Sequence, residues 1–361
     1  MAALMAIYLG ACASVPPPAK VQPLSSVLHV ADHDLEQHQL LDIVLAVFDP
    51  GISNDRLEQQ RNPVYPGVRH AESRFIPYVL RKTLERSGQW GAVRVLPQSD
   101  PSAELLVTGT ILRSNGVELR LHISARDASG HKWLDRIYSD TAGWGYYEKP
   151  PGYSTDPFLN LYNSIANDLN AVRATLTEHD LNRIIDISQL RYAAALSPSA
   201  FADFLLEQPD GSVQLRRLPA RDDPMLARVE RLRQSEYLFI DTVDEQYASF
   251  YRSMGPTYSL WRRYSYGQTM ELEELRQTQQ QGQRGFSGMK QAYDNYKEGK
   301  IQQQALKELA ESFNTEVDPT AMELQGQMVH LQGSLQSQYT EWRRLLRAIY
   351  AEETGMETEN H

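Results

Sequence analysis

The chain has 361 residues, 41% of them hydrophobic, which is enough for a buried core and for more than one domain. Its formal net charge of -10 gives no basic footprint, so we expect no nucleic-acid partner. The mean hydropathy of -0.49 and the lack of a long apolar run exclude a helix-bundle membrane protein. The single cysteine, Cys12, excludes an internal disulfide and a zinc site built from cysteines.

The N-terminus carries an apolar stretch, MAALMAIYL over residues 1–9, that is typical of the h-region of a secretory signal. It ends in a run that resembles the lipobox of bacterial lipoproteins, namely Leu9, Gly10, Ala11 and Cys12. This resemblance implies a signal peptide over residues 1–11, cleavage before Cys12, and attachment to a lipid bilayer through the acylated thiol. No Lys or Arg precedes the apolar stretch, which departs from the pattern.

The predicted tether, residues 12–39, is Pro-rich at its start, and such a chain is an extended, semi-rigid spacer. Ala13 after the cysteine implies, by resemblance to enteric lipoproteins, sorting to the outer membrane with the body facing the periplasm. On a helix, His29 and His33 would share a face and could bind zinc, with His38 further along. The spacing fixes no fourth ligand, so we expect a polar linker, no metal and no cofactor.

The first folded block, residues 40–155, begins with a β-rich apolar run over 41–48 that predicts a central strand. A helix is expected next, capped by Ser73, with Pro77 near its first turn and its end at Gly88. Further strands are predicted over residues 92–96, 105–112, 117–124 and 133–138. The order β-α-β-β-β-β indicates an α+β fold with a mainly antiparallel sheet.

Two short sequence runs in this block predict a turn and indicate a family resemblance. Asn115-Gly116 lies between two β-rich runs and predicts a tight hairpin turn. The run AELLVTG over residues 103–109, together with the order of elements, resembles the small periplasmic domain shared by the curli-secretion lipoprotein family and the amino-terminal domain of TolB. The resemblance covers about a hundred residues and implies a fold, not a function.

A mainly helical region is predicted over residues 156–315. Thr177 is expected to cap one helix, and Ser197-Pro198 to open a short helix that includes Phe204 and Leu205. Asp223-Pro224 opens a longer helix that Gly255-Pro256 is expected to stop after Met254. Apolar residues from Ile240 to Met254 recur by threes and fours, which predicts a seam for a partner helix. A hairpin and an amphipathic helix are predicted over 316–354, before a polar tail at 355–361.

Catalytic motifs are missing, and no residue is predicted to be catalytic. The run Gly285 to Met289 lacks the closing glycine of a nucleophile elbow, and no P-loop is present. The connection GWGYYEKPPGY, residues 143–153, concentrates rings that can stack on sugars or anchor a protein partner, namely Trp144, Tyr146, Tyr147 and Tyr153. The alternative, which we favour, is that these rings pack the sheet against the first helix and fill the contact between the two blocks.

These features predict a membrane-anchored periplasmic lipoprotein that is a non-enzymatic accessory or assembly factor and binds an envelope protein. The rival hypothesis is a lipoprotein that binds a glycan, either peptidoglycan or an exopolysaccharide, through the aromatic loop. A hydrolase ranks third, because paired carboxylates cannot be singled out in so acidic a chain.

Overall fold

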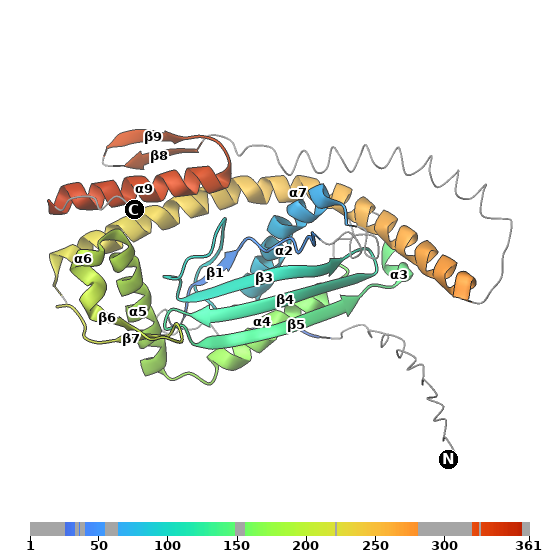
Figure 1. Ribbon diagram of the computed structural model, residues 1–361, viewed down its shortest axis with the longest axis horizontal. Helices are drawn as coiled ribbons and strands as arrows, with labels where there is room; N and C mark the ends of the chain where they lie inside the picture. Colours follow the sequence, from blue (N-terminus) through green and yellow to red (C-terminus); the bar gives the residue numbers. More distant parts are fainter. Residues whose placement is uncertain are drawn as a thin grey trace, which may run out of the picture.

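The computed structural model describes residues 26–32, 36, 40–54, 64–148, 156–220, 222–280, 320–324 and 326–355. It has the predicted α+β fold: a β-α-β-β-β-β block, then helices, then a C-terminal hairpin and helix (Figure 1). None of the helices that the structure describes is both long enough and apolar enough to cross a membrane.

A five-stranded sheet forms the first block, with the order β2-β1-β3-β4-β5. The strands are β1 (Ile43–Ala46), β2 (Val93–Leu96), β3 (Leu105–Ser114), β4 (Glu118–Asp127) and β5 (Lys132–Thr141). β1 pairs in parallel with β2 and β3, whereas β3, β4 and β5 are antiparallel. The predicted turn joins β3 and β4, where Asn115 Oδ1 accepts hydrogen bonds from the backbone N–H groups of Val117 (2.8 Å) and Glu118 (2.7 Å).

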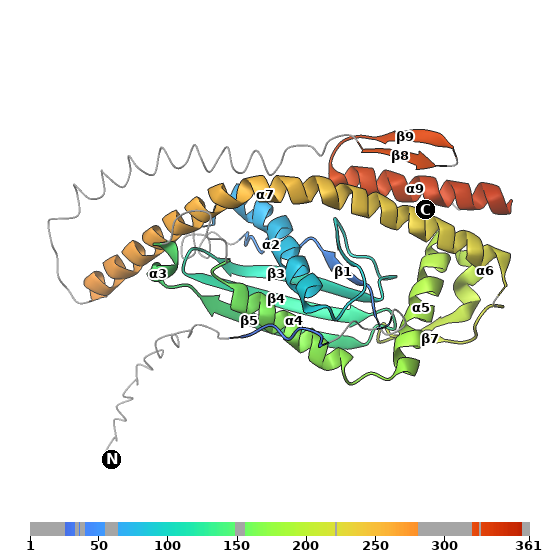
Figure 2. The same ribbon diagram turned by 180° about the vertical axis from the view of Figure 1, so that it is seen from behind.

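Helices α2 (Pro66–Ser87) and α4 (Leu159–Arg173) cover one face of this sheet (Figure 2). Alternate residues of β4 point to that face and are fully buried in the core, namely Leu119, Leu121 and Ile123. The residues between them point to the other face and are half-buried, namely Arg120, His122 and Ser124. In the described part of the chain, no helix lies in front of β4 and β5 on that other face (Figure 1).

Helix α2 begins at Pro66, so the prediction that Ser73 caps it and that Pro77 lies near its first turn is wrong. Pro77 lies inside the helix and cannot donate to the carbonyl of Ser73, four residues earlier. That carbonyl accepts instead from the backbone N–H of Phe48 at 2.8 Å. The segment after β1 therefore supplies the hydrogen bond that Pro77 cannot donate to the Ser73 carbonyl. The predicted end is confirmed, because Gly88 is left-handed with φ of 62°.

The predicted Thr177 cap is confirmed at the start of α5 (Glu178–Leu196), where Thr177 and Asp180 form a reciprocal capping box. Helix α6 (Pro198–Phe201) begins at Pro198 as predicted, but it includes neither Phe204, which ends a 3-10 helix over Ala202–Phe204, nor Leu205. Leu205 starts a strand, and the prediction there is wrong. The two strands of this small hairpin are β6 (Leu205–Glu207) and β7 (Val213–Leu215). Gly211 makes the turn with φ of 81°, after Asp210, a pairing typical of hairpins.

Helix α7 (Pro224–Gln280) has 57 residues and continues through Pro256, so the predicted stop at Gly255-Pro256 is wrong. Tyr251 and Tyr258, on either side of the proline, both contact the ring of Phe75 on α2, with centroids 5.7 and 4.8 Å apart. Tertiary packing on both sides therefore holds the helix across a residue that breaks isolated helices.

The predicted seam on α7 finds its partner within the same chain. Ile240 and Val243 are buried, and helix α9 (Leu335–Thr354) lies beside this part of α7 (Figure 1). Phe239 stacks on Trp342 of α9 with ring centroids 5.6 Å apart. The seam's other side chains, at 247, 250 and 254, lie outside those described. The predicted C-terminal hairpin is confirmed as β8 (Thr320–Leu324) and β9 (Gln327–Leu331).

The predicted division at residue 155 lies between α4 and the short helix α3 (Trp144–Tyr147). One hydrophobic core includes residues from both sides of it, such as Leu121 of β4, Ile165 of α4 and Ile187 of α5. The sheet and the first helices of the second block therefore pack as one body.

Candidate functional site

The predicted aromatic loop is in part a packing feature. The rings of Trp144 and Tyr147, at the two ends of α3, contact the ring of Tyr266 on α7, with centroids 5.5 and 5.3 Å apart. Tyr147 is buried, its hydroxyl donates to the carbonyl of Gly116 at 2.6 Å, and burial raises its pKa. Tyr146 is half-buried. These rings join the sheet block to α7, so they contribute to the contact between the two predicted blocks, but the helix that they contact here is α7 and not the first one.

Among the described members of the predicted set, Trp144 stays open to solvent, with 42% of its surface exposed. The guanidinium of Arg263 lies over this ring at 5.6 Å. Tyr153 lies outside the described residues. A sugar-stacking platform would therefore rest on one described ring of the four.

The other predicted sites lie mostly beyond the described residues. These include the lipobox, Leu9, Gly10, Ala11 and Cys12, and two of the histidines, His33 and His38. His29 is described and exposed. Within the ranges that the structure describes, no three His, Cys, Asp or Glu side chains gather closely enough to hold a metal ion.

A groove of about 560 Å³ lies between α7, the start of α2 and the open face of the sheet. One stripe of α7 forms a wall, with Trp261, Ser265, Gln268 and Leu272. The opposite wall comes from the ends of β3, β4 and β5. Tyr65, just before α2, bridges to α7 by donating its hydroxyl hydrogen to Gln268 Oε1 at 3.3 Å. The volume is within the range of about 300–1,000 Å³ that ligand sites occupy.

The floor of this groove is a buried ion pair. Glu72 and Arg69 of α2 are 1% and 5% exposed, and their Oε2 and Nε atoms are 3.2 Å apart. Glu72 Oε1 also accepts hydrogen bonds from Ser114 Oγ at 2.6 Å and from the hydroxyl of Tyr258 on α7 at 2.7 Å. With these partners, the carboxylate is held in one position and joins three elements.

Arg262 extends this network under α7. It is 2% exposed, donates to the hydroxyl of Tyr258 at 2.5 Å, and lies over the ring of Phe158 at 4.6 Å. The guanidinium is therefore buried against an aromatic ring, where it makes a cation–π contact. The turn at Gly116 touches α7 here: a Cβ atom at Gly116 would lie 2.1 Å from the carbonyl oxygen of Arg262.

The rim of the groove is apolar and exposed. Four side chains of its lining are 39–58% exposed, namely Tyr65, Leu112, Ile137 and Leu272. The nearby cations are already paired, since Arg113 and Arg120 lie 3.2 and 2.6 Å from the two carboxylate oxygens of Glu118. Apolar contact is therefore the main feature of the rim, beside the exposed carboxylate of Glu273 on α7.

One polar group in the wall has no partner. Trp261 is 6% exposed and stacks on Tyr258, yet its indole N–H has no hydrogen-bond acceptor among the described residues. A buried donor without an acceptor costs about 1–3 kcal/mol.

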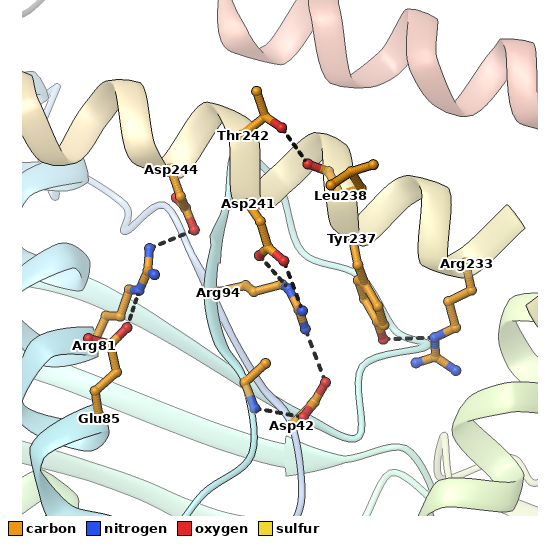
Figure 3. Close-up of polar contacts among 11 residues, drawn as sticks. Asp42, Arg81, Glu85, Arg94, Arg233, Tyr237, Leu238, Asp241, Thr242 and Asp244 are labelled. Atoms are coloured by element: carbon orange, nitrogen blue, oxygen red, sulfur yellow. Dashed lines mark hydrogen bonds and ion pairs between the residues drawn. The ribbon is translucent and has the colours of Figure 1, made fainter. Parts of the chain in front are cut away.

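Polar contacts fix the first half of α7 to the sheet block (Figure 3). Arg94 of β2 donates to Asp241 of α7 at 2.8 and 3.2 Å and to Asp42 at 3.0 Å. Arg81 of α2 donates to Asp244 at 2.6 Å. Burial outweighs this attraction and raises the pKa of Asp244 to about 7. These contacts set the position of the first half of α7 on the sheet block. The second half of the same helix forms a wall of the groove.

Comparisons of the chain with protein-family models, with curated proteins and with solved structures give no match. The resemblances to bacterial lipoproteins and to the curli-secretion domain therefore stay predictions. The groove itself was not predicted, because its lining residues come from α2, α7 and three strands that only the fold brings together.

Proposed function

We propose that the chain is a membrane-anchored lipoprotein of the bacterial envelope that binds a protein partner and catalyses no reaction. The observation that carries the binding role is the groove with its exposed apolar rim. Its aliphatic and aromatic side chains surround a fixed polar floor, and such a pattern is typical of surfaces that bind proteins. The anchor is inferred from the sequence around Cys12.

The carboxylates of the groove favour binding over hydrolysis. Glu72 and Glu273 both line it. Glu72 is saturated by Arg69, Ser114 and Tyr258, so it serves as a structural ion and has little freedom to move a proton. Glu273 lies on the exposed rim of α7. A general acid needs a carboxyl group that can exchange its proton with substrate.

Site-specific photocrosslinking tests the role of the groove. We would place a photoreactive amino acid at Leu112 or Leu272, on opposite walls, and irradiate intact cells. A matched control is Leu260, which lies on α7, is 55% exposed and does not line the groove. The expected result is one common protein adduct from both groove positions and none from Leu260. Adducts that are equal at all three positions, or formed with glycan alone, would contradict the proposal.

A further inference from the structure

Strand β5 forms the outer edge of the sheet. It has ten residues and, among the described strands, pairs with β4 alone. A strand with one open side presents a row of backbone N–H and C=O groups that can pair with another extended chain. Strand β5 therefore offers its backbone as an edge for pairing.

A hollow of about 530 Å³ runs along this edge. Four consecutive residues of β5 line it, namely Arg136, Ile137, Tyr138 and Ser139. Neighbouring residues of a strand point to opposite faces, so a hollow over one face would meet only alternate residues. The hollow therefore opens on the edge itself.

The far side of the hollow is an extended segment of the same chain. Ser26, Val27 and His29 line it there, and Ser164, Asn167 and Asp168 of α4 form its floor. Asparagines at helical spacing on α4 hold the backbone of this segment. Asn163 Nδ2 donates to the carbonyl of Ser26 and Asn167 Nδ2 to that of Val27, both at 2.8 Å, while Asn167 Oδ1 accepts from the N–H of His29 at 2.8 Å. The floor thus already seats one extended chain through its backbone.

Two apolar side chains border the hollow without being buried. Val27 is 81% exposed and Ile137 is 58% exposed. The polar groups beside them are paired, because Asp168 accepts from Arg136 at 2.8 Å and from the hydroxyl of Tyr138 at 2.7 Å. What stays available is an apolar surface and the open backbone of β5.

We propose that an extended segment of a protein partner adds to β5 as a sixth strand, between β5 and residues 26–29. Backbone pairing supplies the affinity, and an apolar side chain of the added strand covers Ile137 and Val27. Ile137 and Ser139 line both this hollow and the groove, so the two surfaces are continuous. A partner that binds in the groove can therefore also contact β5. The inference rests on the proposed binding function and names the class of segment that is bound.

Hydrogen exchange on the purified chain tests this inference with a defined probe. The probe is a blocked eight-residue peptide that alternates Thr and Val between terminal lysines. The same peptide with two prolines in place of valines is the control, because proline donates no backbone hydrogen bond. We expect the first peptide to slow exchange in β5 by about tenfold or more, with no change in the buried strand β1. The proline peptide should leave β5 unchanged.

Variants make the test specific. Ile137→Lys should abolish the protection of β5, whereas Leu206→Lys, at a site that is 44% exposed on β6, should not. Protection of β5 that rises with the concentration of the chain alone would assign the edge to a second copy and overturn the inference. Absence of protection together with intact crosslinks from Leu272 would overturn the β5 assignment only. Absence of both would contradict the binding function as well.

Discussion

Buried charged side chains concentrate where α7 meets the sheet block. Glu72 and Arg262 are almost fully buried, as is Arg233, which donates to Ser188 Oγ at 2.7 Å. A buried ion costs several kcal/mol unless it is paired and hydrogen-bonded. Glu72 is paired with Arg69, while Arg262 and Arg233 are held by hydrogen bonds to Tyr258 and Ser188, so these contacts help to specify where α7 lies.

Glu104 is, with Asp244, a carboxyl group whose ionisation should affect stability within the range from pH 5 to pH 8. Its Oε2 accepts from the backbone N–H of Asp42 at 2.7 Å, and burial, with the nearby charge of Asp42, raises its pKa from 4.5 to about 7. A carboxyl group with a raised pKa stabilises the fold while it is protonated, and this contribution is lost as the pH rises from about 4.5 through about 7. Glu104→Gln should therefore reduce the loss of stability between pH 5 and pH 8, by at most about 1.4 kcal/mol per pH unit.

Urea unfolding at pH 5, 6.5 and 8 measures this effect as a change in the midpoint. A suitable control is Glu341→Gln, since Glu341 is exposed and its hydrogen bond with Arg344 lowers its pKa below this window. We expect the control to follow the unmodified chain. If Glu104→Gln and the unmodified chain lose stability in parallel, then Glu104 does not titrate in this range.

Local signals explain why some residues were predicted correctly. Thr177 and Asp180 lie three residues apart, and Asn115 bonds to residues two and three positions later, so the sequence itself contains both partners. The network under the groove has no such signal. Tyr258 and Glu72 are 186 positions apart, and only the packing of α7 on α2 brings them together. Spacing along the chain therefore predicts helix caps and turns, whose partners are close in sequence. It does not predict the groove, whose residues are far apart in sequence.

At the scale of elements, the largest errors in the predicted helix boundaries lie at the two prolines inside helices, Pro77 in α2 and Pro256 in α7. Proline breaks an isolated helix because it lacks an N–H and clashes with the preceding turn. In α2, the N–H of Phe48 fills the gap left by Pro77, and in α7 the rings of Tyr251 and Tyr258 pack on α2 around Pro256. Both compensations come from other elements, so a reading of the helix sequence alone cannot include them.

The asparagines of α4 give a prediction about the segment before the sheet. Asn167 bonds to the backbone of both Val27 and His29, so Asn167→Ala removes the contacts at the centre of the docked segment. We expect the His29 amide to exchange at least about tenfold faster, with the core strands unchanged. Ser164→Ala is the control, because Ser164 bonds within α4 to the carbonyl of Asn160. Equal exchange in both variants would show that the asparagine does not hold the segment.

At the scale of the whole molecule, α7 is the element that joins the other parts. It runs along the sheet block, carries α9 and the C-terminal hairpin beside its first half, and forms a wall of the groove with its second half (Figure 1). The groove and the open edge of β5 adjoin at Ile137. The two proposed contact sites therefore form one continuous surface.

The proposed anchor would join the body near this surface. Residues 13–25 lie between Cys12 and Ser26, and Ser26 is held on α4 by Asn163. A chain of that length spans at most about 50 Å. The point where the chain joins the body, at Ser26, would thus lie within about 50 Å of the membrane.

Lipid labelling at Cys12 tests the central claim most directly. Cells that express the chain or its Cys12→Ser variant would be grown with radioactive palmitate, and the protein would be isolated and sized. We predict that the unmodified chain takes up label and is shorter by the 11 residues before Cys12, and that the variant is unlabelled and unprocessed. A Cys12→Ser chain that is still shortened and still fractionates with membranes would contradict the account.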